Sequence, residues 1–191
     1  MNDRPRILGI SGSLRKGSFS TAILRAASKQ IAGEADFEVL TLGEIPLYNQ
    51  DLDTGSPPST VTDLRQRIGG ADGLVIATPE YNYGMPGVLK NALDWASRPY
   101  GQSRLTGKPV LTLSSSPAFT GGVRAQAQLN ETLLANASLL VLRPQIVIGL
   151  AMQKVAGGEL IDAQSLEILK AGLEDLVRDI RSKASVVIQE S

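Results

Sequence analysis

The 191-residue chain contains no cysteine and no histidine. Without cysteine it can form no disulfide, no thiolate nucleophile and no cysteine-ligated iron–sulfur cluster. Without histidine a Ser-His-Asp triad is excluded, and a Cys/His zinc site is excluded by both absences. The remaining options are carboxylate, lysine, tyrosine or serine chemistry, a carboxylate-held Mg²⁺, or an organic cofactor with its own reactivity. A cofactor enzyme is the most economical prediction, and a binding protein without chemistry remains the alternative.

The chain also lacks net charge, because 19 Lys and Arg residues balance 19 Asp and Glu residues. No overall field therefore attracts nucleic acid or an anionic membrane. No apolar run is long enough for a signal peptide or a membrane span, which predicts a cytoplasmic protein. With 42% hydrophobic and 20% charged residues, the length and composition fit one globular domain over residues 1–191.

Short apolar runs recur along the chain, and they are nearly continuous rather than alternating, which favours strands buried on both faces. They lie at 7–10, 37–42, 74–77, 110–113, and 139–142 continuing through 146–148. Segments with helical periodicity lie between them. The clearest apolar stripe is formed by Leu166, Leu169, Leu173, Leu176, Val177 and Ile180. This alternation at βαβ spacing predicts a doubly wound α/β fold, with its longest loop at 43–60.

The loop after the first strand, residues 11–21, is rich in hydroxyls and contains Arg15 and Lys16 before a helix predicted to open at Ala22. Hydroxyls, cations and the free N–H groups of a helix start suit a phosphate group. The loop matches neither G-x-G-x-x-G nor the P-loop pattern, so one terminal phosphate of a mononucleotide is the better prediction. A serine- and glycine-rich turn with a helix cap and no ligand remains open.

Two further loops follow the third and fourth predicted strands. Residues 79–87 contain two prolines, two glycines and the pair Tyr81 and Tyr83, which indicates a rigid loop suited to the plane of a conjugated ring. The alternative is that these tyrosines pack in a core or an interface. Residues 114–124 form another hydroxyl- and glycine-rich loop. Because ligands bind at the carboxyl ends of strands in such sheets, the three loops together predict one crevice.

Several motifs follow one another in a characteristic order: GSLRKGS at 12–18, PEYNY at 79–83 with PG-x-LKNA-x-DW at 86–95, and GKPV at 107–110 with GG-x-R-x-Q at 121–126. From about residue 7 to residue 148 they resemble the NADPH-dependent FMN reductase family, which includes bacterial NAD(P)H:quinone and chromate reductases. The resemblance implies a flavodoxin-like three-layer fold with a five-stranded parallel sheet in the order 2-1-3-4-5. It also implies non-covalent FMN and a homodimer or homotetramer.

The resemblance assigns the phosphate of FMN to the first loop, the isoalloxazine to residues 79–83, and a further flavin contact to Ser116. The predicted cofactor-binding residues are Ser11, Ser13, Arg15, Ser18, Phe19, Ser20, Pro79, Glu80, Tyr81, Asn82, Tyr83 and Ser116. Members of the family usually have Asn where this chain has Ser20. Ser can still donate to the phosphate but has a shorter reach, so the difference concerns the affinity for FMN and not the identity of the cofactor. Arg124 matches a family position near the flavin mouth and a subunit contact.

The predicted activity is an FMN-dependent NAD(P)H oxidoreductase. NADPH or NADH reduces the flavin, and a small-molecule acceptor such as a quinone, azo compound, chromate or flavin takes the electrons. No catalytic side chain and no metal site is predicted. The alternatives are a flavodoxin-like electron carrier or FMN-binding sensor without turnover, and a phosphate-binding or Mg²⁺-dependent phosphotransfer domain. Trp95 is expected either at a subunit interface or at a partly buried helix edge.

Overall fold

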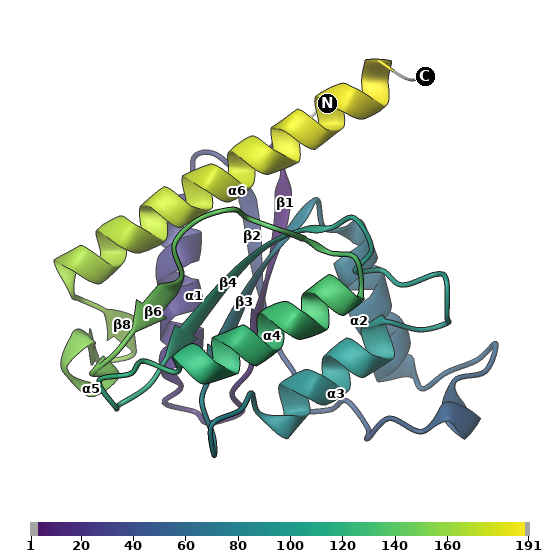
Figure 1. Ribbon diagram of the computed structural model, residues 1–191, viewed down its shortest axis with the longest axis horizontal. Coiled ribbons are helices and arrows are strands. Elements are labelled where there is room, and N and C mark those ends of the chain that lie inside the picture. Colours follow the sequence, from purple (N-terminus) through teal and green to yellow (C-terminus); the bar gives the residue numbers. More distant parts are fainter. Residues whose placement is uncertain (1–3, 190–191) are drawn as a thin grey trace.

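The computed structural model describes residues 4–189, and the side chains of residues 4–185. A parallel sheet forms its centre (Figure 1). The strand order is β2-β1-β3-β4-β5, and β6 also pairs with β4. The strands are β1 (Arg6–Ser11), β2 (Asp36–Thr41), β3 (Gly73–Pro79), β4 (Pro109–Ser115), β5 (Leu139–Leu140) and β6 (Ile146–Ile148). Every pairing in this sheet is parallel. The predicted flavodoxin-like fold and strand order are confirmed.

Helices cover both faces of the sheet and make two hydrophobic cores. The helices are α1 (Phe19–Gln30), α2 (Ser59–Gly70), α3 (Gly87–Ala96), α4 (Val123–Ala135), α5 (Ala151–Lys154) and α6 (Ala163–Gln189), with a 3-10 turn at Gln50–Leu52. Helices α1 and α6 pack on one face, and α2, α3 and α4 pack on the other. A short antiparallel hairpin, β7 (Val155–Ala156) and β8 (Glu159–Leu160), lies beside α1.

The central strand β3 explains the continuous apolar runs of the sequence. Leu74 and Ile76 belong to the core under α2, α3 and α4, whereas Val75 and Ala77 belong to the core under α1 and α6. All four side chains are fully buried. A strand that is covered on both faces has no solvent side, so its sequence does not alternate.

The fifth predicted strand is interrupted. Its two parts, β5 and β6, both pair with β4, but five residues (141–145) of this edge segment lie opposite only two residues (111–112) of β4. Pro144 has no N–H group to donate to the sheet and restricts the backbone of Arg143 before it. The segment therefore leaves the sheet between the two pairings, and Leu142 is 98% exposed.

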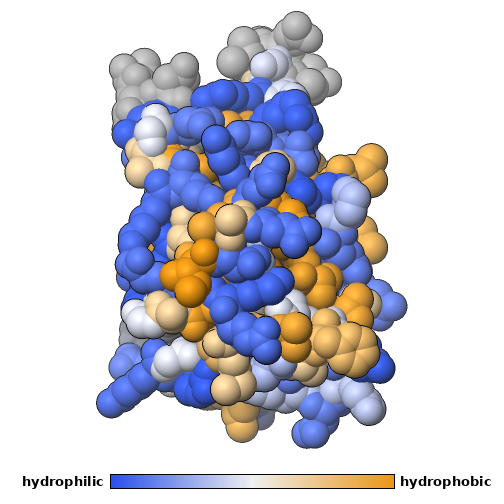
Figure 2. Space-filling model, turned by 90° about the vertical axis from the view of Figure 1, so that its left-hand side faces the viewer, coloured by the Kyte–Doolittle hydropathy of each residue, from blue (hydrophilic) through white to orange (hydrophobic). Residues whose placement is uncertain are grey.

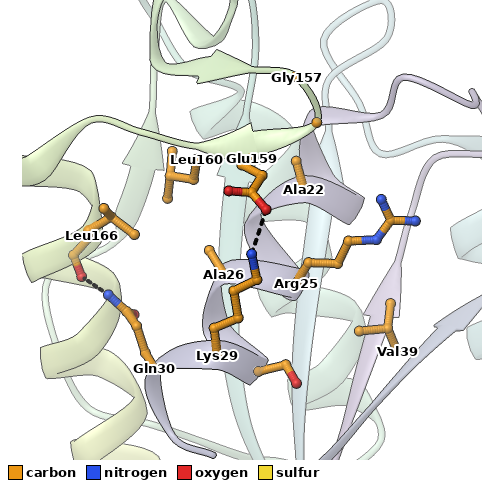
Figure 3. Close-up of a pocket in the computed structure, with 12 residues that line it drawn as sticks. Ala22, Arg25, Ala26, Lys29, Gln30, Val39, Gly157, Glu159, Leu160 and Leu166 are labelled. Carbon is orange, nitrogen blue, oxygen red and sulfur yellow. Dashed lines mark hydrogen bonds and ion pairs between the residues drawn. The ribbon is translucent and has the colours of Figure 1, made fainter.

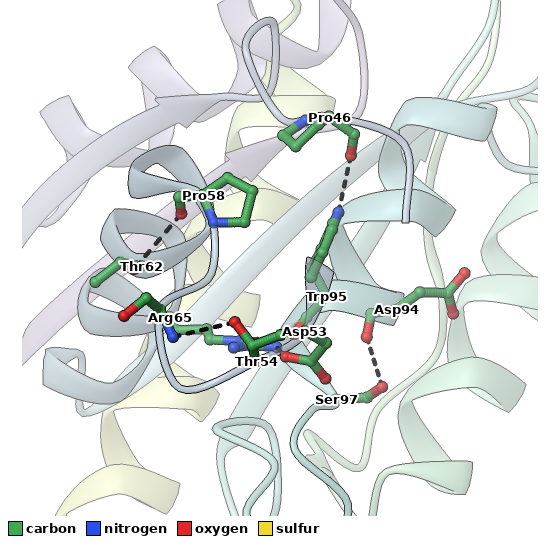
Figure 4. Close-up of polar contacts among 10 residues, drawn as sticks. Pro46, Asp53, Thr54, Pro58, Thr62, Arg65, Asp94, Trp95 and Ser97 are labelled. Atoms are coloured by element: carbon green, nitrogen blue, oxygen red, sulfur yellow. Dashed lines mark hydrogen bonds and ion pairs between the residues drawn. The ribbon is translucent and has the colours of Figure 1, made fainter. Parts of the chain in front are cut away.

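Trp95 is a core residue, so its predicted place at an interface or a partly buried helix edge is wrong. Its side chain is 0% exposed, and its indole N–H donates to the carbonyl of Pro46 at 2.8 Å (Figure 4). Asn91, one turn earlier on α3, donates to the same carbonyl at 2.8 Å and accepts from the N–H of Tyr48 at 2.7 Å. The nearly buried ion pair between Arg65 and Asp53, at 2.8 Å, holds the next part of the same loop. The long predicted loop is thus tied to α2 and α3.

Helix α1 begins at Phe19, three residues before the predicted start at Ala22. Ser18 is the N-cap residue, and its hydroxyl accepts from the N–H of Thr21 at 3.2 Å. Serine is among the preferred N-cap residues, so this start agrees with ordinary capping chemistry. This start places the free N–H groups of α1 directly after the hydroxyl-rich loop.

Candidate cofactor-binding site

A cavity of about 220 Å³ lies at the carboxyl ends of the central strands. These strand ends are at the lower side of the sheet in Figure 1. The lining residues of the cavity are Ser13, Arg15, Ser18, Phe19, Ser20, Pro79, Glu80, Tyr81, Ser115, Ser116 and Pro117. All of these except Ser115 and Pro117 belong to the predicted cofactor-binding set. The three loops singled out in the sequence therefore do meet at one crevice, as the switch-point geometry of such sheets requires.

The start of α1 forms the polar side of the cavity. Ser13, Ser18 and Ser20 are buried, and the first turn of α1 carries no acidic residue. A helix N-terminus of this kind presents free N–H groups and a positive dipole end to an anion. Arg15 donates to the carbonyl of Gly17 at 2.7 Å, and its guanidinium lies 4.9 Å from the ring centre of Phe19. The donor set fits a phosphate monoester.

Ser11 lies behind this loop rather than in the cavity lining. It is fully buried, and its hydroxyl lies 2.8 Å from the hydroxyl of Thr21. This pair ties the end of β1 to the first turn of α1, and so supports the loop between them. A direct contact of Ser11 with the phosphate remains a prediction.

The loop after β3 forms a tight two-residue hairpin. The N–H and C=O groups of Tyr81 and Gly84 bond each other in both directions at 3.0 Å, and the turn residues Asn82 and Tyr83 have φ values of 49° and 68°. Two left-handed residues in succession are the geometry of a type I′ turn. Tyr81 lines the cavity and is 54% exposed, whereas Asn82 and Tyr83 stand outside its lining. The alternative that these tyrosines are core residues is wrong.

Tyr83 is 73% exposed and lies against α4. The guanidinium of Arg124 sits 4.3 Å from its ring centre, within the range of a cation–π contact. Arg124 also reaches Glu80, with 3.4 Å between its Nη1 and the Oε1 of Glu80. Glu80 lines the cavity, but its carboxylate is directed to the start of α4.

The loop after β4 completes the cavity and contains the residues that the sequence analysis missed. The hydroxyl of Ser115, which is 1% exposed, lies 3.4 Å from the hydroxyl of Ser20. Ser116 accepts from the N–H of Ala118 at 3.2 Å, and Pro117 follows it in the lining. Ser115 lies in the serine run 114–116 at a strand end, and the alternation of side chains along β4 was the available signal for choosing it.

A larger cavity of about 440 Å³ lies between α1 and the β7–β8 hairpin (Figure 3). Lys29 and Glu159 pair across it at 2.5 Å, and the hydrogen bond from Lys29 lowers the pKa of the Glu159 carboxyl. Gln30 donates to the carbonyl of Leu166 at 2.8 Å. None of the predicted cofactor residues lines this cavity. Lys29 thus fastens the hairpin to α1, and Gln30 joins α1 to the start of α6.

Within residues 4–189 no cluster of acidic side chains could hold a metal ion, and no helix is long and apolar enough to cross a membrane. The parallel sheet, with a hydroxyl-rich helix start and an aromatic hairpin at the carboxyl ends of its strands, has the architecture of the flavodoxin-like class of nucleotide-binding proteins.

Within that class, the chain belongs to the NADPH-dependent FMN reductase family, whose sequence profile matches residues 5–153. An NAD(P)H-dependent FMN reductase of Pseudomonas aeruginosa is 41% identical over 177 residues, which cover 92% of this chain and 95% of the relative. A quinone reductase of Escherichia coli is 39% identical over 177 residues, covering 91% and 94%. The solved structure of FerB, a flavoenzyme NAD(P)H:(acceptor) oxidoreductase from Paracoccus denitrificans, superposes with a TM-score of 0.83 at 33% identity, covering 93% and 98%.

Family membership confirms the predicted function. The chain is an FMN-dependent oxidoreductase that takes electrons from NAD(P)H and passes them to a small-molecule acceptor. Family membership also excludes the two alternative functions that the residues alone left open, which were a carrier or sensor without turnover and a phosphotransfer domain.

Proposed function

We propose that the 220 Å³ cavity is the FMN site. The open face of the bound flavin would receive NAD(P)H and then a quinone. We also propose that residues 1–191 form a single domain. The observation that carries the proposal is the meeting of the phosphate-type loop and the Tyr81 hairpin in one cavity. A mononucleotide with a conjugated ring needs a loop that holds its phosphate and, close by, an aromatic wall for its flat ring. The phosphate-type loop and the Tyr81 hairpin supply these two parts.

The start of α1 and the surrounding hydroxyls would hold the phosphate. Ser13, Ser18 and Ser20 supply buried hydroxyls, and Arg15 supplies the cation. The ribityl chain would pass the hydroxyls of Ser115 and Ser116. These contacts fix the position of the cofactor, and the charge-assisted ones carry most of the affinity.

Bound FMN supplies the redox chemistry, because it accepts a hydride from the nicotinamide and gives the electrons to the acceptor. The chain contributes binding and orientation. Backbone N–H groups near the ring would favour the negative charge that builds on reduction. No side chain at the site is needed as a proton donor, since the cavity opens to solvent.

The size of the cavity supports an open flavin face. Ligand pockets that enclose a drug-sized molecule are usually about 300–1,000 Å³, and this cavity of about 220 Å³ is smaller. It would therefore enclose part of the cofactor and leave a ring face for the two substrates in turn. A flat quinone suits such a face, and relatives of this chain are named quinone reductases.

We also propose a homodimer or homotetramer, in the cytoplasm. Exposed apolar side chains, among them Phe119, Leu150 and Met152, are available for contacts between copies. On the face shown in Figure 2 the apolar residues form small separate groups among hydrophilic ones. A non-obligate interface taken as a whole is about as apolar as the rest of the surface, so a contact between copies does not need a larger apolar patch.

The test is reconstitution followed by turnover. The purified protein is titrated with FMN under fluorescence detection, and NADPH and NADH oxidation is then followed with a quinone, an azo dye, chromate and free FMN as acceptors. The expected result is a yellow protein with the highest kcat/KM for the quinone. A protein that takes up no FMN would contradict the site, and turnover that favours another acceptor would contradict only the quinone assignment.

A further inference from the structure

Helix α4 has no N-cap side chain of its own. Its N-cap residue is Gly122, in the left-handed conformation at φ 88°, and its first turn contains no acidic residue. The first N–H groups of a helix have no partner within the helix and need one from elsewhere. The partner here is Glu80 of the β3–α3 loop, whose Oε2 accepts from the N–H of Arg124 at 3.0 Å and from the N–H of Ala125 at 3.2 Å.

Close backbone approach makes this contact possible. A Cβ atom on Gly122 would lie 3.3 Å from the Cβ of Ser114 and 3.4 Å from the Cβ of Glu80. The helix start thus lies directly against the ends of β3 and β4. The PEYNY and GG-x-R motifs, about 40 residues apart in the sequence, form one structural unit.

The hairpin that follows Glu80 needs support. Both Asn82 and Tyr83 have positive φ, and whereas Asn is favoured in a type I′ turn, a bulky residue such as Tyr83 rarely adopts this conformation. Helix α4 supports the hairpin at two further points. The side chain of Gln128 accepts from the N–H of Met85 at 2.8 Å, and Arg124 lies over the ring of Tyr83.

We propose that Glu80 is a positioning residue of the flavin site. Its side chain is 10% exposed, and its carboxylate holds the Tyr81–Gly84 hairpin on the N-terminus of α4 and thereby fixes Tyr81 as a wall of the cavity. The negative charge faces the positive end of the helix dipole and the guanidinium of Arg124, so the two attractions act in the same direction. The hold on the hairpin does not depend on a ligand, whereas the effect on FMN rests on the proposed function.

The first experiment uses the flavin-free protein and hydrogen exchange of backbone amides. In Glu80→Ala the amides of Arg124, Ala125 and Gly84 should exchange at least tenfold faster than in the wild type. Glu80→Gln should lie between, because its amide oxygen still accepts while its charge is gone. The control is Glu131→Gln, an exposed position on the same helix, which should leave these rates unchanged. Unchanged rates in both Glu80 variants would overturn the proposal.

The second experiment measures FMN. The dissociation constant should rise about tenfold in Glu80→Ala and about threefold in Glu80→Gln, with no change in Glu131→Gln. At saturating FMN the bound flavin of Glu80→Ala should fluoresce more strongly than that of the wild type, which a loss of overall stability alone would not produce. Faster exchange with unchanged affinity and unchanged fluorescence would overturn the role in positioning. If Glu80→Ala does not fold, Glu80→Gln decides both experiments.

The two failures can be told apart. If the wild-type protein takes up no FMN, the proposed function fails, while the exchange rates still show whether Glu80 holds the hairpin. If the wild type binds FMN and both Glu80 variants match it in affinity, fluorescence and exchange, the function stands and the role of Glu80 falls.

Discussion

The β1–α1 loop and the β3–α3 loop line the same cavity but are held in different ways. In the first loop most bonds are local, such as those between Ser18 and Thr21 and between Arg15 and Gly17. In the second, the hairpin depends on Arg124, Ala125 and Gln128, which are more than 40 residues away in the sequence. The side of the cavity that we propose for the phosphate is therefore encoded in one short segment, and the aromatic side forms only when α4 packs.

The largest expected effect is a loss of unfolding free energy when Gly121 is replaced by alanine, compared with the same replacement at Gly17. Gly121→Ala places a Cβ 2.4 Å from Cγ1 of Val147 and 2.8 Å from the N of Gly149, at a φ of 63°. Strain and overpacking should cost about 3 kcal/mol of unfolding free energy, or a fall in Tm of about 6–12 °C. Thermal unfolding of the flavin-free protein measures it.

The matched control lies in the β1–α1 loop, whereas Gly121 belongs to the β4–α4 loop. A Cβ on Gly17 would meet nothing within 4 Å, so Gly17→Ala should change stability by less than about 1 kcal/mol. Equal losses in the two variants would contradict the expectation that Gly121 of the β4–α4 loop is packed closely against the end of β6 while Gly17 of the β1–α1 loop is free of such contacts.

The next effect sharpens the assignment of the first loop to phosphate. Ser18→Ala removes the N-cap hydroxyl and should cost about 1 kcal/mol of stability. If the same hydroxyl also donates to a phosphate dianion, the FMN dissociation constant should rise by about tenfold or more. Ser185→Ala on α6, remote from the cavity, is the control for the titration. A stability loss with unchanged affinity would leave Ser18 as a cap only.

A smaller effect is expected at Ser20, where the resemblance implies that the family usually has Asn. Ser20 is buried beside Ser115, and Ser20→Asn would extend a longer donor into the cavity. One added hydrogen bond to a charged group predicts an FMN dissociation constant that falls about threefold to tenfold. Fluorescence titration measures the change, and weaker binding would show that the cavity has no room for the amide.

The smallest expected effect is a pH dependence of stability caused by Lys108, which lies at the amino end of β4, opposite the cavity. Burial, followed by the charge of Lys183, lowers the pKa of Lys108 from its ordinary value of 10.5, although Lys108 donates to the carbonyls of Gly69 and Ala71. The unfolded chain therefore holds this proton to higher pH than the folded protein does.

Because the pKa of Lys108 is lower in the folded protein than in the unfolded chain, the free energy of unfolding should rise slightly with pH between the lowered pKa and 10.5. Lys108→Met should lose that slope and keep the wild-type affinity for FMN, because Lys108 is not in the cavity lining. Chemical denaturation at several pH values below 10.5 measures it. A falling stability in the same interval would contradict the direction of the shift.

Local patterns in the sequence predicted most of the fold and the polar half of the site. Continuous apolar runs identified the strands, and the cluster around Arg15 identified the loop that lines the cavity. Long-range contacts were not accessible in this way. The carboxylate of Glu80 reaches α4, Trp95 is buried under Pro46, and the edge strand is interrupted at Pro144. Each of these depends on which segments meet in space, and a single sequence does not display that.

The interrupted edge formed by β5 and β6 has a consequence for self-association. An uninterrupted edge strand would offer a row of unpaired N–H and C=O groups to a strand of another molecule. Here residues 141–145 bulge outward between two short pairings, so that row is broken. A second copy cannot extend the sheet across this side in regular register, and contacts there must come from side chains.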